Sequence, residues 1–173
     1  MILLFGLAGS GKSTQGRILA DKYGWQWLSA GEVLRRTKKF EETMDKGELV
    51  DDDTVIELMA NEIQKAKSEG KNVILDGFPR DEYQTEKLLE RMGDDIKKAI
   101  YLDVPKEELW ERIKLRGRED DTEESVKKRF EIVEQNIYSI LSLLKAKNIA
   151  TVQVDGLGSR EDVMARLVQE VEK

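Results

Sequence analysis

Gly6-Leu7-Ala8-Gly9-Ser10-Gly11-Lys12-Ser13-Thr14 is the stretch that decides the fold. It fits the pattern G-x-x-x-x-G-K-[ST] and lies between an apolar run, Ile2–Phe5, and a helical pattern over Lys12–Tyr23. Glycines let the backbone curl so that several amide N–H groups point inward, and the following helix adds its positive N-terminal end. The stretch therefore predicts a strand, a phosphate-binding loop and a helix. Lys12 would act as a cation for the outer phosphates, with Ser13 or Thr14 close to a magnesium ion.

Short apolar runs alternate with helical patterns along the rest of the chain. Gly24 and Gly70 follow two helical patterns as stop signals, and Ser159 with Asp162 is typical of a cap for the last helix. Pro105 suits the first turn of a helix. Five short buried strands between helices predict a parallel sheet covered on both faces, which is a three-layer α/β domain. After Ile2–Phe5, the expected strands are 25–28, 73–75, 99–102 and 151–154.

Composition excludes several kinds of chemistry. The 173 residues fit one domain, and 29 basic against 35 acidic residues give a net charge of −6, which argues against sequence-independent nucleic-acid binding. Without cysteine or histidine there is no disulfide, no thiolate nucleophile, no zinc site of the Cys or His type and no His-based triad. Catalysis must use carboxylates, Lys, Arg, hydroxyls, backbone amides or an oxygen-bound cation. The opening apolar run is too short to cross a membrane, so we expect a cytoplasmic protein.

Two further sets of charges point to a phosphate site. Asp76 ends an expected buried strand, which places its carboxylate at the carboxyl edge of the sheet beside the phosphate loop, where it could hold magnesium through water. Arginine forks bind phosphate in a bidentate way and stay charged at any useful pH. A group of arginines in an acidic chain therefore predicts one focused cationic cleft. They are Arg35, Arg80, Arg112, Arg116, Arg118 and Arg129.

Several further blocks of sequence are informative because of the order in which they follow one another along the chain. The most diagnostic is Asp76-Gly77-Phe78-Pro79-Arg80, followed by Gln84. The others are the loop with Thr14-Gln15 after it, Ser29–Arg35, Gly47–Asp51, Asp103–Pro105 with Arg112, Arg118–Asp121 with Arg129, and Asp155–Gly158. In this order they resemble the nucleoside monophosphate kinase family, and its adenylate kinases most closely. The resemblance spans nearly the whole chain.

The resemblance implies one domain of the P-loop kinase fold over residues 1–173, with a five-stranded parallel sheet flanked by helices. Its core would comprise residues 1–28, 54–116 and 122–173. Residues 29–53 would form an inserted monophosphate-binding flap, and residues 117–121 a vestigial lid. The Phe78–Pro79 peptide bond would be cis.

The resemblance also implies a role for each matching position. The AMP site would comprise Ala30, Arg35, Leu49, Val50, Gly77, Arg80 and Gln84, with the two arginines on the α-phosphate and Gln84 reading the base. The ATP site would comprise Gly9, Ser10, Gly11, Lys12, Ser13, Thr14, Arg112 and Gly158, with Arg112 against the adenine. The catalytic cations would be Lys12, Arg80, Arg116, Arg118 and Arg129. Ser13 and Asp76 would hold Mg²⁺ that arrives with ATP, and zinc would be absent.

Two positions depart from the family pattern and leave alternatives open. Ala30 replaces a threonine common in adenylate kinases and is familiar from UMP/CMP kinases, whereas the amide of Gln84 can present a donor and an acceptor to adenine. We therefore expect ATP and AMP as substrates of a monomer, with UMP/CMP kinase activity as the alternative. A catalytically weak nucleotide-binding module is a further alternative. Because only Gly117 separates Arg116 from Arg118, either the lid is a tight turn or these two arginines have slipped roles.

Overall fold

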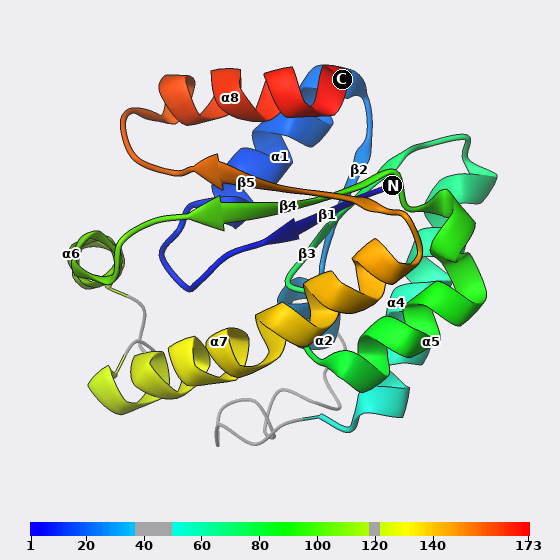
Figure 1. The fold of residues 1–173 in the computed structure, drawn as a ribbon, viewed down its shortest axis with the longest axis horizontal. Helices are drawn as coiled ribbons and strands as arrows, with labels where there is room; N and C mark the ends of the chain where they lie inside the picture. The colour runs from blue at the N-terminus through cyan, green and yellow to red at the C-terminus, as the bar shows by residue number, and fades with distance from the viewer. Residues whose placement is uncertain (37–49, 118–121) are drawn as a thin grey trace.

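The computed structural model describes residues 1–36, 50–117 and 122–173, and its central element is a five-stranded parallel sheet (Figure 1). The strand order is β2-β3-β1-β4-β5, so the strand that leads into the phosphate loop lies in the middle. In the register, Leu4 lies beside Asp76 on one side and Ile100 on the other. The strands are β1 (Ile2–Phe5), β2 (Gln26–Ser29), β3 (Val73–Asp76), β4 (Lys98–Asp103) and β5 (Ala150–Asp155).

Helices cover both faces of the sheet, which confirms the predicted three-layer α/β fold. Figure 1 shows α1 and α8 on one face, and α4, α5 and α7 on the other. Successive residues of β1 alternate between the two layers, since Ile2 and Leu4 pack in one hydrophobic cluster and Leu3 and Phe5 in the other. The helices are α1 (Lys12–Tyr23), α2 (Ala30–Arg36), α4 (Asp52–Ser68), α5 (Glu82–Met92), the 3₁₀ turn η2 (Gly93–Asp95), α6 (Lys106–Arg116), α7 (Glu123–Ala146) and α8 (Arg160–Glu172).

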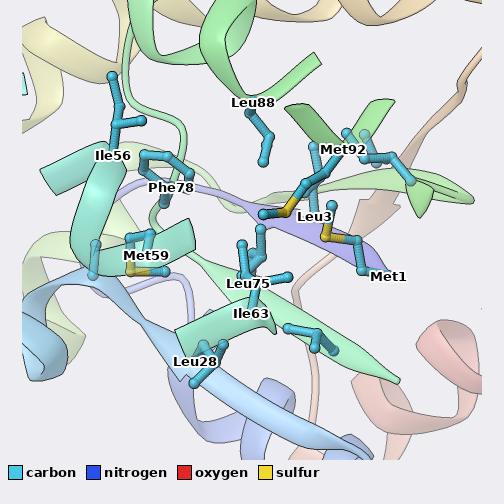
Figure 2. Close-up of a cluster of buried hydrophobic side chains, with 14 of the residues drawn as sticks. Met1, Leu3, Leu28, Ile56, Met59, Ile63, Leu75, Phe78, Leu88 and Met92 are labelled. Carbon is cyan, nitrogen blue, oxygen red and sulfur yellow. The ribbon is translucent and has the colours of Figure 1, made fainter. Parts of the chain in front are cut away.

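The larger hydrophobic cluster fixes the segment that follows β3. Figure 2 shows Phe78 close to Ile56 and Met59 of α4, while Leu75 lies near Ile63. Phe78 is 1% exposed, and the Phe78–Pro79 peptide bond is cis, as the resemblance implied. Burial of such a side chain contributes roughly 1.5–3 kcal/mol. The cluster therefore holds the chain from Asp76 to Arg80 against the carboxyl end of the sheet.

Local signals placed several boundaries correctly. The predicted helix Lys12–Tyr23 is confirmed at both ends, and Gly24 closes it with φ 66°. Ser159 and Asp162 form the expected capping box of α8.

Several predicted boundaries were wrong by one residue: β3 also includes Asp76, and β4 and β5 are each one residue longer at both ends. The second strand runs from Gln26 to Ser29, not 25–28, because the amide of Trp25 bonds the Ala20 carbonyl at 2.8 Å and so closes α1. Pro105 is the N-cap of α6 and not part of its first turn.

Parts of the predicted flap and lid lie outside the described residues, namely 37–49 and 118–121. Of the flap, Ala30–Arg36 forms α2, and Asp51 caps α4 by accepting a hydrogen bond from the Thr54 amide at 2.9 Å. Across the described ranges, we find no helix with the length and apolar character needed to cross a membrane.

Candidate functional site

The loop between β1 and α1 has the backbone that an anion requires. Gly9 and Gly11 have φ of 85° and 89°, a region that L side chains rarely adopt. A Cβ on Gly9 would lie 3.0 Å from the Leu109 carbonyl oxygen, so the loop packs closely against α6. Gly11 is the N-cap of α1 and has no side chain to bond the first helical amides. These amides and the positive end of α1 are therefore directed at the space above the loop.

That space is a cleft of about 740 Å³ at the carboxyl end of the sheet. Its position is the one expected for parallel α/β sheets, where loops leave neighbouring strands in different directions. It is lined from α1, α2, α6, α7, the segment after β3 and the loop before α8. The predicted site residues that it brings together are Gly9, Ser10, Gly11, Lys12, Ser13, Thr14, Arg35, Asp76, Gly77, Arg80, Arg112, Arg129 and Gly158.

Other predicted residues are not brought into this cleft. Ala30 is fully buried, Gln84 is 3% exposed, and neither these two nor Val50 lines it. Leu49 and Arg118 lie outside the described residues. Arg116 belongs to the last turn of α6, but its side chain is also outside the description.

Asp76 is a buried acidic side chain of the cleft. It is 2% exposed, and within the described part of the chain its Oδ2 atom has no hydrogen-bond partner. Leaving a buried polar atom unsatisfied costs about 1–3 kcal/mol, more when it is charged, so such an atom calls for an explanation. A carboxylate on a residue that lines this cleft is suited to a hard cation such as Mg²⁺, alone or through water.

Among the described residues, no group of three or more acidic side chains is arranged so that it could hold a metal ion. Mg²⁺ does not need such a cluster, because it commonly keeps several waters and binds one or two protein oxygens together with substrate phosphates. Asp76 and the half-buried Ser13 both line the cleft and can supply those oxygens. The donor set therefore fits magnesium bound with a nucleotide.

Arg80 lines the cleft in the segment that follows β3, and its charged neighbours include Asp76 and Arg35. Its Nε donates to the Gly77 carbonyl at 2.9 Å, which holds the guanidinium close to the backbone. Desolvation lowers the pKa of Arg80 from its ordinary value, Asp76 opposes that effect, and Arg35 adds to it. Arg80 as a whole residue is exposed, and it lines the cleft. Its guanidinium is therefore open to a ligand, although neighbouring protein atoms partly desolvate it. Arginine starts so far above neutral pH that it stays charged.

Arg112 and Arg129 are each held by local partners. Arg112 bonds Glu108 on its own helix at 2.8 Å, and its Nη2 donates to the Gly156 carbonyl at 3.2 Å. Arg112 thus links α6 to the loop before α8. Arg129 bonds the carbonyl oxygen of Ser125 at 3.2 Å and its hydroxyl at 3.0 Å. Both guanidinium groups are therefore positioned before any ligand arrives.

Sequence reasoning missed two charged residues that line the cleft, Arg160 and Glu108. Arg160, at the start of α8, lies beside the phosphate loop, since its carbonyl accepts a bond from Gln15 Nε2 at 2.9 Å. Glu108 orients Arg112. The signal for Arg160 was available, because it directly follows the cap residue Ser159 and the matched loop. No local pattern identifies Glu108, apart from its i,i+4 spacing to Arg112.

Comparisons with known proteins agree with one another. A family profile described as "Adenylate kinase" matches residues 4–149. A relative from Phocaeicola vulgatus is 36% identical over 187 aligned residues, covering 99% of this chain and 98% of the relative. Relatives from Thermus thermophilus (96% and 94% covered) and Micrococcus luteus (98% and 89%) are each 34% identical. All three carry the name adenylate kinase.

Proposed function

The chain belongs to the adenylate kinase family, whose reaction is phosphoryl transfer between ATP and AMP, and we propose that the cleft above the sheet is where this transfer takes place. One observation carries the proposal. In a chain of net charge −6, the cleft gathers a loop lysine, five arginines and a buried carboxylate from separate elements. Charge focused in this way stabilises phosphates and the charge that moves during transfer.

The donor nucleotide is assigned to the side of the cleft next to the phosphate loop. The amides of Gly9 to Thr14 would surround its β- and γ-phosphates, with Lys12 on the outer phosphate. Arg112 would lie against the adenine, and backbone near Gly158 would meet its exocyclic amine. The link from Arg112 to the Gly156 carbonyl supports this assignment, because it keeps the guanidinium beside that loop.

The acceptor is assigned to the side formed by α2 and the segment after β3. Arg35 and Arg80 would hold the α-phosphate of AMP, beside the Gly77 backbone. Gln84 would read the base, and Ala30, Leu49 and Val50 would complete the pocket. Support comes from the lining of the cleft, to which α2 contributes Arg35 and the segment after β3 contributes Arg80.

The transfer needs no general base, which suits a chain without histidine. The attacking atom is a phosphate oxygen that is already ionised near neutral pH. Catalysis is therefore a matter of holding the two phosphates in line and stabilising the equatorial oxygens. Lys12 can follow the moving charge, and Arg129 would contact the transferring group together with Arg116 and Arg118.

Mg²⁺ bound with ATP would be held by Ser13 and Asp76. When bound, the ion neutralises the charge of the β- and γ-phosphates and orients them. The unsatisfied Oδ2 of Asp76 is the observation that favours this role. We also propose that the enzyme acts as a monomer in the cytoplasm, with no nucleic acid or membrane as a partner. Light scattering of the purified protein tests the monomer.

A substrate panel combined with one pair of variants tests the site. ADP formation is measured with ATP and AMP, CMP, UMP, GMP or dAMP, and AMP should give the highest kcat/KM. Arg35→Ala should weaken AMP binding at least tenfold, whereas Arg36→Ala should change it little. Arg36 is the matched control, because it is exposed, pairs with Glu32 at 3.5 Å and does not line the cleft. Equal losses in the two variants would refute the acceptor assignment.

A further inference from the structure

Two hydrogen bonds join the first turns of α4 and α5. Gln84 Nε2 donates to Asp52 Oδ1 at 2.7 Å, and the Tyr83 hydroxyl donates to Asp53 Oδ1 at 2.7 Å. The two bonds differ in burial, since Gln84 is 3% exposed and Tyr83 is 42% exposed. Only the Gln84 bond therefore fixes a buried side chain that carries a proposed binding role.

The partners of Gln84 determine which way its amide points. An ionised carboxylate can only accept a hydrogen bond and a backbone N–H can only donate one. Asp52 therefore requires the nitrogen of the Gln84 amide, and the Arg80 backbone N–H, 2.9 Å from Oε1, requires its oxygen. Rotating the Gln84 amide by 180° would break both hydrogen bonds. Its oxygen would then face the Asp52 carboxylate, and its NH₂ group would face the Arg80 backbone N–H.

Two bonding positions of the amide remain. A primary amide has two N–H groups and an oxygen with two lone pairs. After the bonds to Asp52 and Arg80, one N–H and one lone pair are left for a ligand, in an order that the two neighbours have fixed. The order matters because adenine presents a ring acceptor at N1 beside an amino donor at C6, whereas hypoxanthine presents a ring donor beside a carbonyl acceptor.

We propose that Asp52 is a positioning residue for acceptor-base selectivity: it locks the amide of Gln84 in the orientation that serves the 6-amino edge of AMP and not the reversed edge of a 6-oxopurine. The inference rests on the proposed role of Gln84 as the reader of that base. Asp52 itself does not touch the nucleotide. Asp52 acts on selectivity because its carboxylate can only accept a hydrogen bond. A partner that could also donate one would tolerate either orientation of the Gln84 amide.

The test compares kcat/KM for AMP and for inosine monophosphate in the wild-type protein, Asp52→Asn and Asp53→Asn. Asparagine has the shape of aspartate but can bond either end of a rotated amide. A hydrogen bond to a charged group corresponds to a factor of roughly ten or more. Asp52→Asn should therefore lower the AMP-to-IMP ratio about tenfold, with the KM for ATP unchanged. Asp53→Asn removes the same charge from the same helical turn and alters the Tyr83 bond, and it should keep the wild-type ratio.

The outcomes separate this inference from the proposed function. Gln84→Leu should erase the preference for AMP; if it does and Asp52→Asn does not lower the ratio, the base-reading role stands and the inference is overturned. If Asp52→Asn reduces turnover of both nucleotides equally, or if Asp53→Asn lowers the ratio as much, Asp52 is merely structural and the inference is overturned too. A preference for AMP that survives Gln84→Leu would overturn both. Thermal unfolding of each variant checks that the fold is retained.

Discussion

Replacing Asp76 by Asn should make the protein more stable and nearly inactive at the same time. In the ligand-free protein, the carboxylate is 2% exposed with one oxygen lacking a partner among the described residues. A buried, unsatisfied polar atom costs about 1–3 kcal/mol, and a neutral amide costs less to bury than a carboxylate. Part of this gain is offset because Arg80 loses an attractive neighbour, which is worth up to about 1 kcal/mol for an exposed arginine.

The net expectation is a rise of about 1 kcal/mol in the free energy of unfolding without ligand. For a chain of this size that corresponds to roughly 2–4 °C in Tm. Turnover should fall about 10²- to 10³-fold, the loss typical when one preorganised electrostatic group is removed from an active site. Mg·ATP at a hundredfold excess over Kd stabilises a protein by about 2.7 kcal/mol, and the variant should lose most of the magnesium-dependent part of that gain.

The assay is urea unfolding with and without Mg²⁺ and ATP, alongside steady-state turnover. Asp103→Asn is the matched control, because Asp103 also ends a strand of the sheet but is exposed and already bonds Gln153 at 2.7 Å. That control should change neither stability nor turnover by much. A ligand-free Asp76→Asn protein that is less stable than wild type, or that keeps its magnesium-dependent stabilisation, would show that the buried oxygen is not held ready for a cation.

Three further predictions concern the same cleft. Lys12→Met should leave the fold intact and retain less than about a tenth of wild-type turnover, because one preorganised cation typically contributes 10²–10³ in rate; a steady-state assay with a circular-dichroism melt decides it. Arg80→Ala should weaken AMP binding and Arg112→Ala should weaken ATP binding in calorimetric titrations, and equal loss of both nucleotides in each variant would contradict the two-sided cleft. Gly9→Ala should lower the free energy of unfolding by about 1–3 kcal/mol and weaken ATP binding, through its φ of 85° and the 3.0 Å approach to α6. Gly24→Ala has a φ of 66° but open space for the Cβ, so in denaturant melts it should show backbone strain without loss of ATP affinity.

Sequence alone predicted the elements that depend on neighbours in the chain. The bounds of α1 follow from Gly11 and Gly24, two residues with positive φ at its two ends. The cap of α8 follows from Ser159 and Asp162, which bond each other three residues apart. The position of Asp76 at the sheet edge follows from the apolar run Val73–Leu75 directly before it, which forms the buried part of β3.

Features that depend on distant contacts could not be predicted from the sequence. The partner of Gln84 on α4, Asp52, is 32 residues away in the chain, and the Gly156 carbonyl that holds Arg112 is 44 residues away. Both bonds exist only after the helices have packed on the sheet. The one-residue shift of β2 has a similar origin, since Trp25 is strand-like by composition but its amide is needed to close α1.

The arrangement also explains how an acidic chain can bind polyanionic nucleotides. Acidic side chains are spread over the surface, where water and salt screen charges beyond about 10 Å. Cations of the cleft are instead held in part by backbone carbonyls, as with Arg80 on Gly77 and Arg129 on Ser125. A carbonyl orients a guanidinium without neutralising it, so the positive charge stays available to the phosphates. Net charge therefore says little about this site, and the partners that hold each arginine decide what it can bind.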